Sequence, residues 1–305
     1  MVPREIVTPS AKISDDIVAP FSLDHAPVRG RIVRAGAAID AILRRHDYPR
    51  PAAMLLGEAL MLAALVGSLV KVEHRLIVQA QGDGPVPMLV AEYRPSGALR
   101  GYARVREGAD LPQAHRLAPA ALIGQGRLAI MLEQDEESAT YQGVVPLDGE
   151  TLAACAESYF AVSEQTDTRI RLAVGEVSGA GPAQWRGGGI LMQKIAADVA
   201  RGDPAEDWSR AGMLMATVRD DELIDPALGA DRLLYRLFHE EDVRMGEPGV
   251  LADQCTCTEE RLVAVLKQFP AAEVDDLVEP DGMLHARCQF CSRTYAFAPE
   301  RVRGA

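Results

Sequence analysis

Four of the five cysteines lie close together near the C-terminus, and this grouping constrains the fold more than any other feature of the 305-residue chain. They form the segments Cys255-Thr-Cys257 and Cys288-Gln-Phe-Cys291, which are separated by thirty residues. In a reducing compartment such a group indicates a metal site more readily than two disulfides. Two close pairs of thiolates suit a tetrahedral zinc ion. We therefore expect one Zn²⁺ per chain, held by Cys255, Cys257, Cys288 and Cys291.

The residues around the cysteines predict a small module in which the second pair sits at a hairpin tip. The apolar spacing after Thr258 predicts a helix with Thr258 as its N-cap. The segments Met283–Arg287 and Arg293–Phe297 alternate as strands on either side of the second cysteine pair. A module of about 60 residues is too small to fold securely on its own core, so a metal would stabilise it.

The spacing alone leaves the role of the metal site open. A disulfide between Cys255 and Cys257 would close a small, strained ring that is easily reduced, and zinc keeps sulfurs as thiolates, the form that reacts with oxidants. The site can therefore be a purely structural staple or a redox switch. A thiol oxidoreductase that uses Cys288 and Cys291 is another interpretation, but such a motif is expected to open a helix.

Two other residues are candidates for a functional site. Cys155 lies in a helical context and is expected to be a small buried apolar residue. His285 lies beside the second cysteine pair, where a role as a further ligand is the weaker interpretation. Neither residue belongs to a recognisable catalytic arrangement, and we expect no enzymatic activity.

The charge balance argues against a nucleic-acid partner. The net charge is −12, whereas phosphate contacts require Lys and Arg. Residues 1–193 carry 22 acidic and 19 basic side chains, and residues 194–305 carry 22 and 13. A zinc-ribbon accessory factor that binds nucleic acid or the ribosome is the alternative function, and the acidity of the C-terminal part counts against it.

The sequence also argues against a membrane partner. Its longest apolar run, Ala59–Val70, has 12 residues, short of the ~20 that span a bilayer. The N-terminus lacks a basic stretch followed by an apolar core, so no secretory signal is expected. We expect a cytoplasmic protein.

Strands in hairpins with flanking helices predict an α+β fold. The first 25 residues are expected to be a loose lead-in, followed by helical signals to about Val72 that include the buried helix Met54–Val70. The remaining predicted elements are the strands Arg75–Gln81, Val86–Tyr93, Ala98–Val105, Gly126–Leu132 and Thr140–Pro146, and the helix Gly149–Phe160.

We predict three parts: a sheet-and-helix core domain (1–193), a helical, metastable linker (194–250) and a small zinc-binding module (251–305). Gly187-Gly-Gly189 is expected to end the core pattern. Isolated helices as short as those of the linker are marginal in water, so we expect them to need the support of the zinc module. Release of the linker is expected to expose Met213, Leu214, Met215, Leu234, Leu237 and Phe238.

Over nearly its whole length the chain resembles the 33-kDa heat-shock chaperone family, the redox-regulated holdases of the bacterial cytoplasm. The cysteine pattern matches that family's zinc centre, and Tyr295-x-Phe297 after the last cysteine also fits. The other matching segments are His46-Asp-Tyr-Pro49, Gln81-Gly-Asp-Gly-Pro85, Arg100-Gly-Tyr-Ala-Arg104, Tyr141-Gln-Gly-Val-Val-Pro146, Ser163-Glu-Gln165 with Thr168-Arg169, and Gly187-Gly-Gly-Ile-Leu-Met-Gln193.

The resemblance implies a redox-regulated, ATP-independent holdase that is inactive while reduced and zinc-bound. Oxidation would form the disulfides Cys255–Cys257 and Cys288–Cys291, release zinc and unfold the linker. The oxidised protein would dimerise and protect unfolding client proteins from aggregation under oxidative stress.

Overall fold

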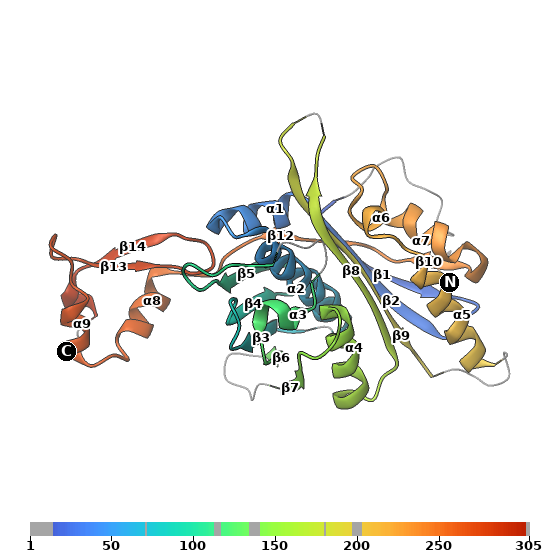
Figure 1. The fold of residues 1–305 in the computed structure, drawn as a ribbon, viewed down its shortest axis with the longest axis horizontal. Coiled ribbons are helices and arrows are strands. Elements are labelled where there is room, and N and C mark those ends of the chain that lie inside the picture. The colour runs from blue at the N-terminus through green and yellow to red at the C-terminus, as the bar shows by residue number, and fades with distance from the viewer. Residues whose placement is uncertain are drawn as a thin grey trace. The chain divides into compact units, whose positions relative to one another are not determined.

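The computed structural model describes residues 15–70, 72–112, 117–133, 141–179, 181–196 and 203–302. The chain forms two compact units, with the boundary between Asp253 and Gln254. In the larger unit, helix α2 (Arg50–Leu69) packs against strands of two sheets (Figure 1). The prediction of an α+β fold is confirmed, whereas the functional division into three parts stays a prediction.

One six-stranded sheet contains the predicted meander. Its order is β12-β5-β4-β3-β6-β7, and all pairings are antiparallel except that of β12 with β5. The predicted strand starting at Thr140 begins at Tyr141 among the described residues. The bounds are β3 (Arg75–Gly82), β4 (Met88–Tyr93), β5 (Ala98–Arg104), β6 (Gly126–Glu133), β7 (Tyr141–Pro146) and β12 (Ala252–Asp253).

The second sheet contains segments for which the sequence predicted no strand. Its order is β10-β1-β2-β9-β8, with β11 paired to β1. Residues 1–14 of the expected lead-in lie outside the described residues, but the expectation is wrong for the strand that follows. The bounds are β1 (Ile17–Leu23), β2 (Val28–Ala35), β8 (Thr168–Val177), β9 (Gln184–Lys194), β10 (Val243–Met245) and β11 (Gly249–Val250).

The three consecutive glycines at 187–189 lie inside β9, so the expectation that they end the core pattern is wrong. All three are buried between the neighbouring strands and helices. A Cβ at Gly188 would lie 2.1 Å from the carbonyl oxygen of Leu223. The absence of a side chain there allows the backbone of another segment to rest directly on the strand.

Helix α2 fills the space between the two sheets. Sixteen of its residues are buried, including Leu56, Leu60 and Leu65. By length and composition the helix could cross a membrane, but 83% of its most apolar stretch is buried inside the unit, and we assign it to the core. The other helices around this core are α1 (Ala37–Leu43), α3 (Pro119–Ile123) and α4 (Leu152–Ser163).

Three helices from the predicted linker cover the other face of the β1-β2-β9-β8 sheet (Figure 1): α5 (Pro204–Ala216), α6 (Asp220–Ile224) and α7 (Ala230–Phe238). The rings of Phe21 and Phe238 stack there, with centroids 5.9 Å apart. Met215, Leu234, Leu237 and Phe238 are buried as expected, and Leu214 is partly buried. Met213 is 63% exposed, so its expected burial is wrong, because it faces away from the sheet.

The smaller unit contains the cysteine pairs. Its elements are α8 (Glu259–Leu266), α9 (Ala271–Asp276), β13 (Leu284–Arg287) and β14 (Thr294–Phe297). Strands β13 and β14 form the predicted antiparallel hairpin. Single turns of 3-10 helix occur in both units, at Arg44–His46, His239–Glu241 and Pro299–Arg301.

Candidate metal centre

The four clustered cysteines meet in the smaller unit. Their sulfur atoms all lie within 4.8 Å of one another. The Sγ atoms of Cys255 and Cys288 are 3.8 Å apart, and those of Cys257 and Cys291 are 3.3 Å apart. A tetrahedral ion with ligands at ~2.3 Å places its sulfurs ~3.8 Å from one another. The donor set and its spacing therefore fit a tetrahedral metal ion that prefers thiolates.

The hairpin positions the second pair of cysteines. The backbone N–H of Cys288 donates to the carbonyl of Arg293 at 2.9 Å, and that of Ser292 donates to the carbonyl of Cys288 at 2.8 Å. Ser292 has a φ of 58°, in the left-handed region that tight turns use. These bonds fold the chain back on itself, so that the side chains of Cys288 and Cys291 converge on one point.

The first pair is positioned by the start of helix α8. The side chain of Thr258 accepts a hydrogen bond from the backbone N–H of Arg261 at 3.3 Å, which confirms its predicted role as N-cap. Cys257 directly precedes this cap, and Cys255 lies two residues after Asp253, the last residue of β12. The cysteine pair therefore spans the connection between the end of the larger unit and the first helix of the smaller one.

Tyr295 supports the site in a way that sequence reasoning did not identify. Its hydroxyl donates to the backbone carbonyl of Cys257 at 3.2 Å and lies 3.3 Å from the sulfur of the same residue. The guanidinium of Arg293 donates to this hydroxyl at 3.5 Å. The family motif includes Tyr295, but only the folded hairpin shows that this side chain reaches across to the first cysteine pair.

The thiols influence one another's ionisation. Burial opposes ionisation of Cys257, but hydrogen bonds from Tyr295 and the three other cysteines outweigh it and lower the pKa of its thiol to about 7. Burial and hydrogen bonds with its neighbours raise the pKa of Cys291 to about 12, despite an opposing backbone N–H from Arg293. The cluster thus favours a thiolate at Cys257, the form that binds metal and reacts with oxidants.

The core of the smaller unit is minor without a metal. Its fully buried apolar side chains among the described residues are Val274, Leu284, Phe297 and Val302. Complete burial of one such side chain contributes roughly 1.5–3 kcal/mol. Since ordering costs ~1–2 kcal/mol per residue of backbone, four such side chains do not stabilise a unit of this size. A metal ion on the four cysteines would add stability that this small core does not supply.

The two other candidates lie elsewhere. Cys155 is buried in helix α4 of the larger unit, where burial raises the pKa of its thiol. Its predicted role as a buried apolar residue agrees with this position. His285 forms an ion pair with Asp281 at 2.8 Å, and this contact raises the pKa of its imidazole. The group of potential ligands among the described residues consists of the four cysteines, without His285.

Comparisons with known proteins agree with one another. A sequence model of the family described as Hsp33 protein matches residues 16–298. The 33 kDa chaperonin of Caulobacter vibrioides is 50% identical over 301 residues, covering 96% of this chain and 98% of that protein. The 33 kDa chaperonin of an Enterobacter strain is 38% identical over 281 residues, covering 91% and 90%.

A solved structure shares the fold. The crystal structure of the 33 kDa chaperonin (heat shock protein 33 homolog) of Thermotoga maritima matches with a TM-score of 0.77 and 24% sequence identity. The match covers 94% of this chain and 96% of that one.

Proposed function

The chain belongs to the Hsp33 family of heat-shock chaperones, and on that premise we propose that it is a redox-regulated, ATP-independent holdase. Hsp33 proteins are chaperones rather than enzymes. In this proposal the protein is inactive while reduced and metal-bound. Oxidation activates it, and it then binds unfolding proteins and prevents their aggregation.

The metal in the reduced state is, in our proposal, one Zn²⁺ per chain on Cys255, Cys257, Cys288 and Cys291. The convergence of four sulfurs within 4.8 Å supports this choice, because a closed set of four thiolates is typical of structural zinc. Zinc bound there would supply ~10–16 kcal/mol of apparent binding free energy, as in finger peptides. This free energy would add to that of a core with four fully buried apolar side chains among its described residues, so loss of the metal would remove a large part of the unit's stability.

Oxidation would remove this support. An oxidant such as hypochlorous acid or peroxide would take two electrons from each cysteine pair to form the disulfides Cys255–Cys257 and Cys288–Cys291. A disulfide sulfur is a poor metal ligand, so zinc would leave. Two sulfur contacts in the folded cluster, Cys255–Cys288 and Cys257–Cys291, run between the two pairs, so peptide mapping of oxidised protein must decide the disulfide pairing.

The surface that becomes available lies under the linker, and its burial is the observation that carries the proposal. Helices α5, α6 and α7 cover an apolar sheet face that includes Phe21, Ile32, Ile190 and Met192. Once oxidised and metal-free, the residues from 254 onward would unfold. The linker would then be free to unfold and would uncover this face. Apolar surface of that kind binds the exposed apolar segments of an unfolding protein.

The remaining properties follow from the same proposal. The partners are unfolded or partly unfolded client proteins, and the oxidised form is a homodimer. The protein would act in the cytoplasm, where a reducing environment keeps the cysteines metal-bound until stress occurs. The acidic charge of the chain fits a protein without a nucleic-acid partner.

Light scattering from a thermally unfolding test protein distinguishes the two redox states. We expect the oxidised, metal-free chain to suppress aggregation at stoichiometric amounts and the reduced, zinc-loaded chain to leave it unchanged. Equal suppression by both forms would contradict the redox switch. As a matched pair, Cys288→Ser should lower the zinc content measured by metal analysis, whereas Cys155→Ser should retain one zinc per chain.

A further inference from the structure

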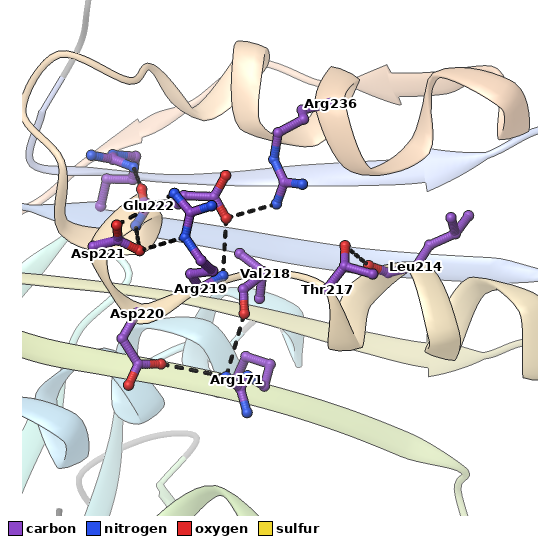
Figure 2. Close-up of polar contacts among 10 residues, drawn as sticks. Arg171, Leu214, Thr217, Val218, Arg219, Asp220, Asp221, Glu222 and Arg236 are labelled. Atoms are coloured by element: carbon purple, nitrogen blue, oxygen red, sulfur yellow. Dashed lines mark hydrogen bonds and ion pairs between the residues drawn. The ribbon is translucent and has the colours of Figure 1, made fainter.

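Three arginines of the sheet hold helix α6 and the residues that flank it, and two of them, Arg34 and Arg186, do so by its backbone. Arg34 of β2 donates to the carbonyls of Glu222, at 3.1 Å, and of Asp225. Arg186 of β9 donates through Nε to the carbonyl of Ile224 at 2.8 Å. Arg171 of β8 reaches the carbonyl of Val218 and a carboxylate oxygen of Asp220, both at 3.4 Å (Figure 2).

The acidic side chains of α6 bond to other groups, so Arg34 and Arg186 reach α6 through its backbone carbonyls, while Arg186 also pairs with Asp15 at 2.5 Å. Asp221 pairs with Arg219, and Glu222 pairs with Arg236 of α7, as Figure 2 shows. Arg34 in turn directs its two terminal nitrogens at carbonyl oxygens. The sheet therefore recognises a feature that every residue of every protein possesses, rather than a particular side chain.

Arg34 is costly to keep in this position. It is 1% exposed, and its Nε has no hydrogen-bond partner among the described residues. Burial lowers its pKa to about 10, with Asp15 and Asp225 opposing and Arg186 adding to the shift, so the guanidinium stays charged at neutral pH. A buried charge with incomplete pairing destabilises a fold. An apolar residue at this position would pack against α6 with a smaller desolvation penalty. Packing of α6 on the sheet therefore does not by itself account for a charged residue at position 34.

The strand surface beside these arginines is shaped for a backbone. Gly188 faces Leu223 so closely that an added Cβ would lie 2.1 Å from the Leu223 carbonyl oxygen. Gly188 pairs with Arg34 across the β2–β9 ladder, so the position without a side chain lies next to the guanidinium that donates to the carbonyls. The side chain of Leu223 is itself buried in the apolar cluster that continues along the sheet.

We infer that Arg34, Arg186 and Gly188 form a carbonyl cradle that binds the backbone of unfolded client segments once α6 has left it. The inference rests on the proposed function, because it requires that the linker be released. In the closed state α6 occupies the cradle as a client segment would, with carbonyls on the arginines and one apolar side chain on the sheet. Native proteins pair most of their carbonyls internally, whereas unfolded chains present them freely, so the cradle favours unfolded chains of any sequence.

The test compares arginine with lysine at the cradle, which keeps the charge but loses the planar, two-pronged donor. The variant is Arg34→Lys with Arg186→Lys in the full chain. The matched control is Arg31→Lys, because Arg31 lies on the same strand and donates to the carbonyl of Ser68 at 3.2 Å, in a helix of the core. The probes are two labelled, disordered peptides rich in apolar residues, one with Glu at its polar positions and one with Gln.

The measurement is peptide affinity by fluorescence anisotropy on fully oxidised protein, in which the linker is released in every variant. We expect the cradle variant to bind both peptides about tenfold more weakly than the unaltered protein, since hydrogen bonds from charged donors contribute that much. The Arg31→Lys control should bind as the unaltered protein does. Unchanged affinity of the cradle variant, or weakening for the Glu peptide alone, would overturn the inference.

Failure of the proposed function gives a different result. In that case the unaltered oxidised protein itself would keep its linker protected from hydrogen exchange, or would bind neither peptide. A second measurement needs no variant and so does not depend on its folding. An arginine-selective dicarbonyl reagent should modify Arg34 and Arg186 in the oxidised protein, and the Gln peptide should protect both. Modification that the bound peptide leaves unchanged would overturn the cradle while leaving the holdase proposal intact.

Discussion

The two faces of the β1-β2-β9-β8 sheet are covered in different ways. On one face lies α2, a 20-residue helix with sixteen buried residues that also packs against the second sheet. On the other face lie the helices of the linker, of 13, 5 and 9 residues, whose polar anchors are arginines bonded to backbone carbonyls. One face of the sheet thus belongs to the main core, and the other carries the helices that we propose to be released on oxidation.

We expect the difference in length between α2 and the linker helices to decide which of them can leave the sheet. Helices shorter than about 12–15 residues are marginal in water and depend on tertiary packing. The linker helices obtain that packing from one apolar cluster, whereas α2 is enclosed on both sides. We therefore expect a modest loss of support to release the linker before it affects the core.

The largest expected effects come from two variants, each of which truncates one buried side chain on one face of the sheet. Phe238→Ala deletes the ring that stacks on Phe21, at a cost of ~3–5 kcal/mol, and should free the linker of the reduced protein. The variant should retain its zinc and suppress aggregation without oxidation. Leu65→Ala, a deletion from α2 on the opposite face, costs ~2–5 kcal/mol and should lower the melting temperature without conferring activity. Activation by Leu65→Ala but not by Phe238→Ala would contradict the comparison.

A smaller effect is expected from adding one methyl group to either face of β9. In Gly188→Ala the new Cβ meets the backbone of Leu223, which cannot move without displacing α6, at a cost of ~1–3 kcal/mol. In Gly187→Ala it meets the side-chain tips of Ile39 and Met61, which can yield. Light scattering with the reduced variants should show partial activation by Gly188→Ala alone. Equal behaviour of the two variants would mean that α6 does not depend on its close approach to the sheet.

The smallest effect concerns the ion pairs of the linker surface. Arg236→Gln breaks the 2.9 Å pair between α7 and Glu222 and should destabilise the linker by at most about 1 kcal/mol, less at high salt. Arg219→Gln removes a more exposed pair with Asp221 and serves as the control. Hydrogen exchange of α6 and α7 should change slightly for the first variant and hardly at all for the second. A large change in exchange for either variant would show that side-chain ion pairs hold the linker helices on the sheet.

Much of the fold was predictable where the pattern is local. The meander of β3, β4 and β5 and the buried helix α2 follow from periodicity and turn residues, and the structure confirms them. Strand β1 was missed because Pro20 lowers its strand propensity and its partners include β10, more than 200 residues away in the chain. The glycines of β9 were misinterpreted because the close approaches that they allow, of α6 at Gly188 and of Ile39 and Met61 at Gly187, exist only in the folded chain.

The same limit applies to the sites. The spacing of the cysteines predicted that four thiols would converge on one point, and the structure places their sulfurs within 4.8 Å of one another. The contact of Tyr295 with Cys257 could not be predicted, since it needs the geometry of the hairpin. The arginines that hold α6 are likewise separated from their carbonyls by 38 to 191 residues, and no local pattern marks them.

Hydrogen–deuterium exchange across the redox transition tests whether the linker is released while the core stays folded. We expect oxidation with loss of zinc to speed exchange in residues 203–250 while α2, on the opposite face of the sheet, stays protected. The same oxidised sample must suppress client aggregation. An oxidised sample that suppresses aggregation while α5, α6 and α7 remain as protected as in the reduced protein would show that linker release does not activate the chaperone.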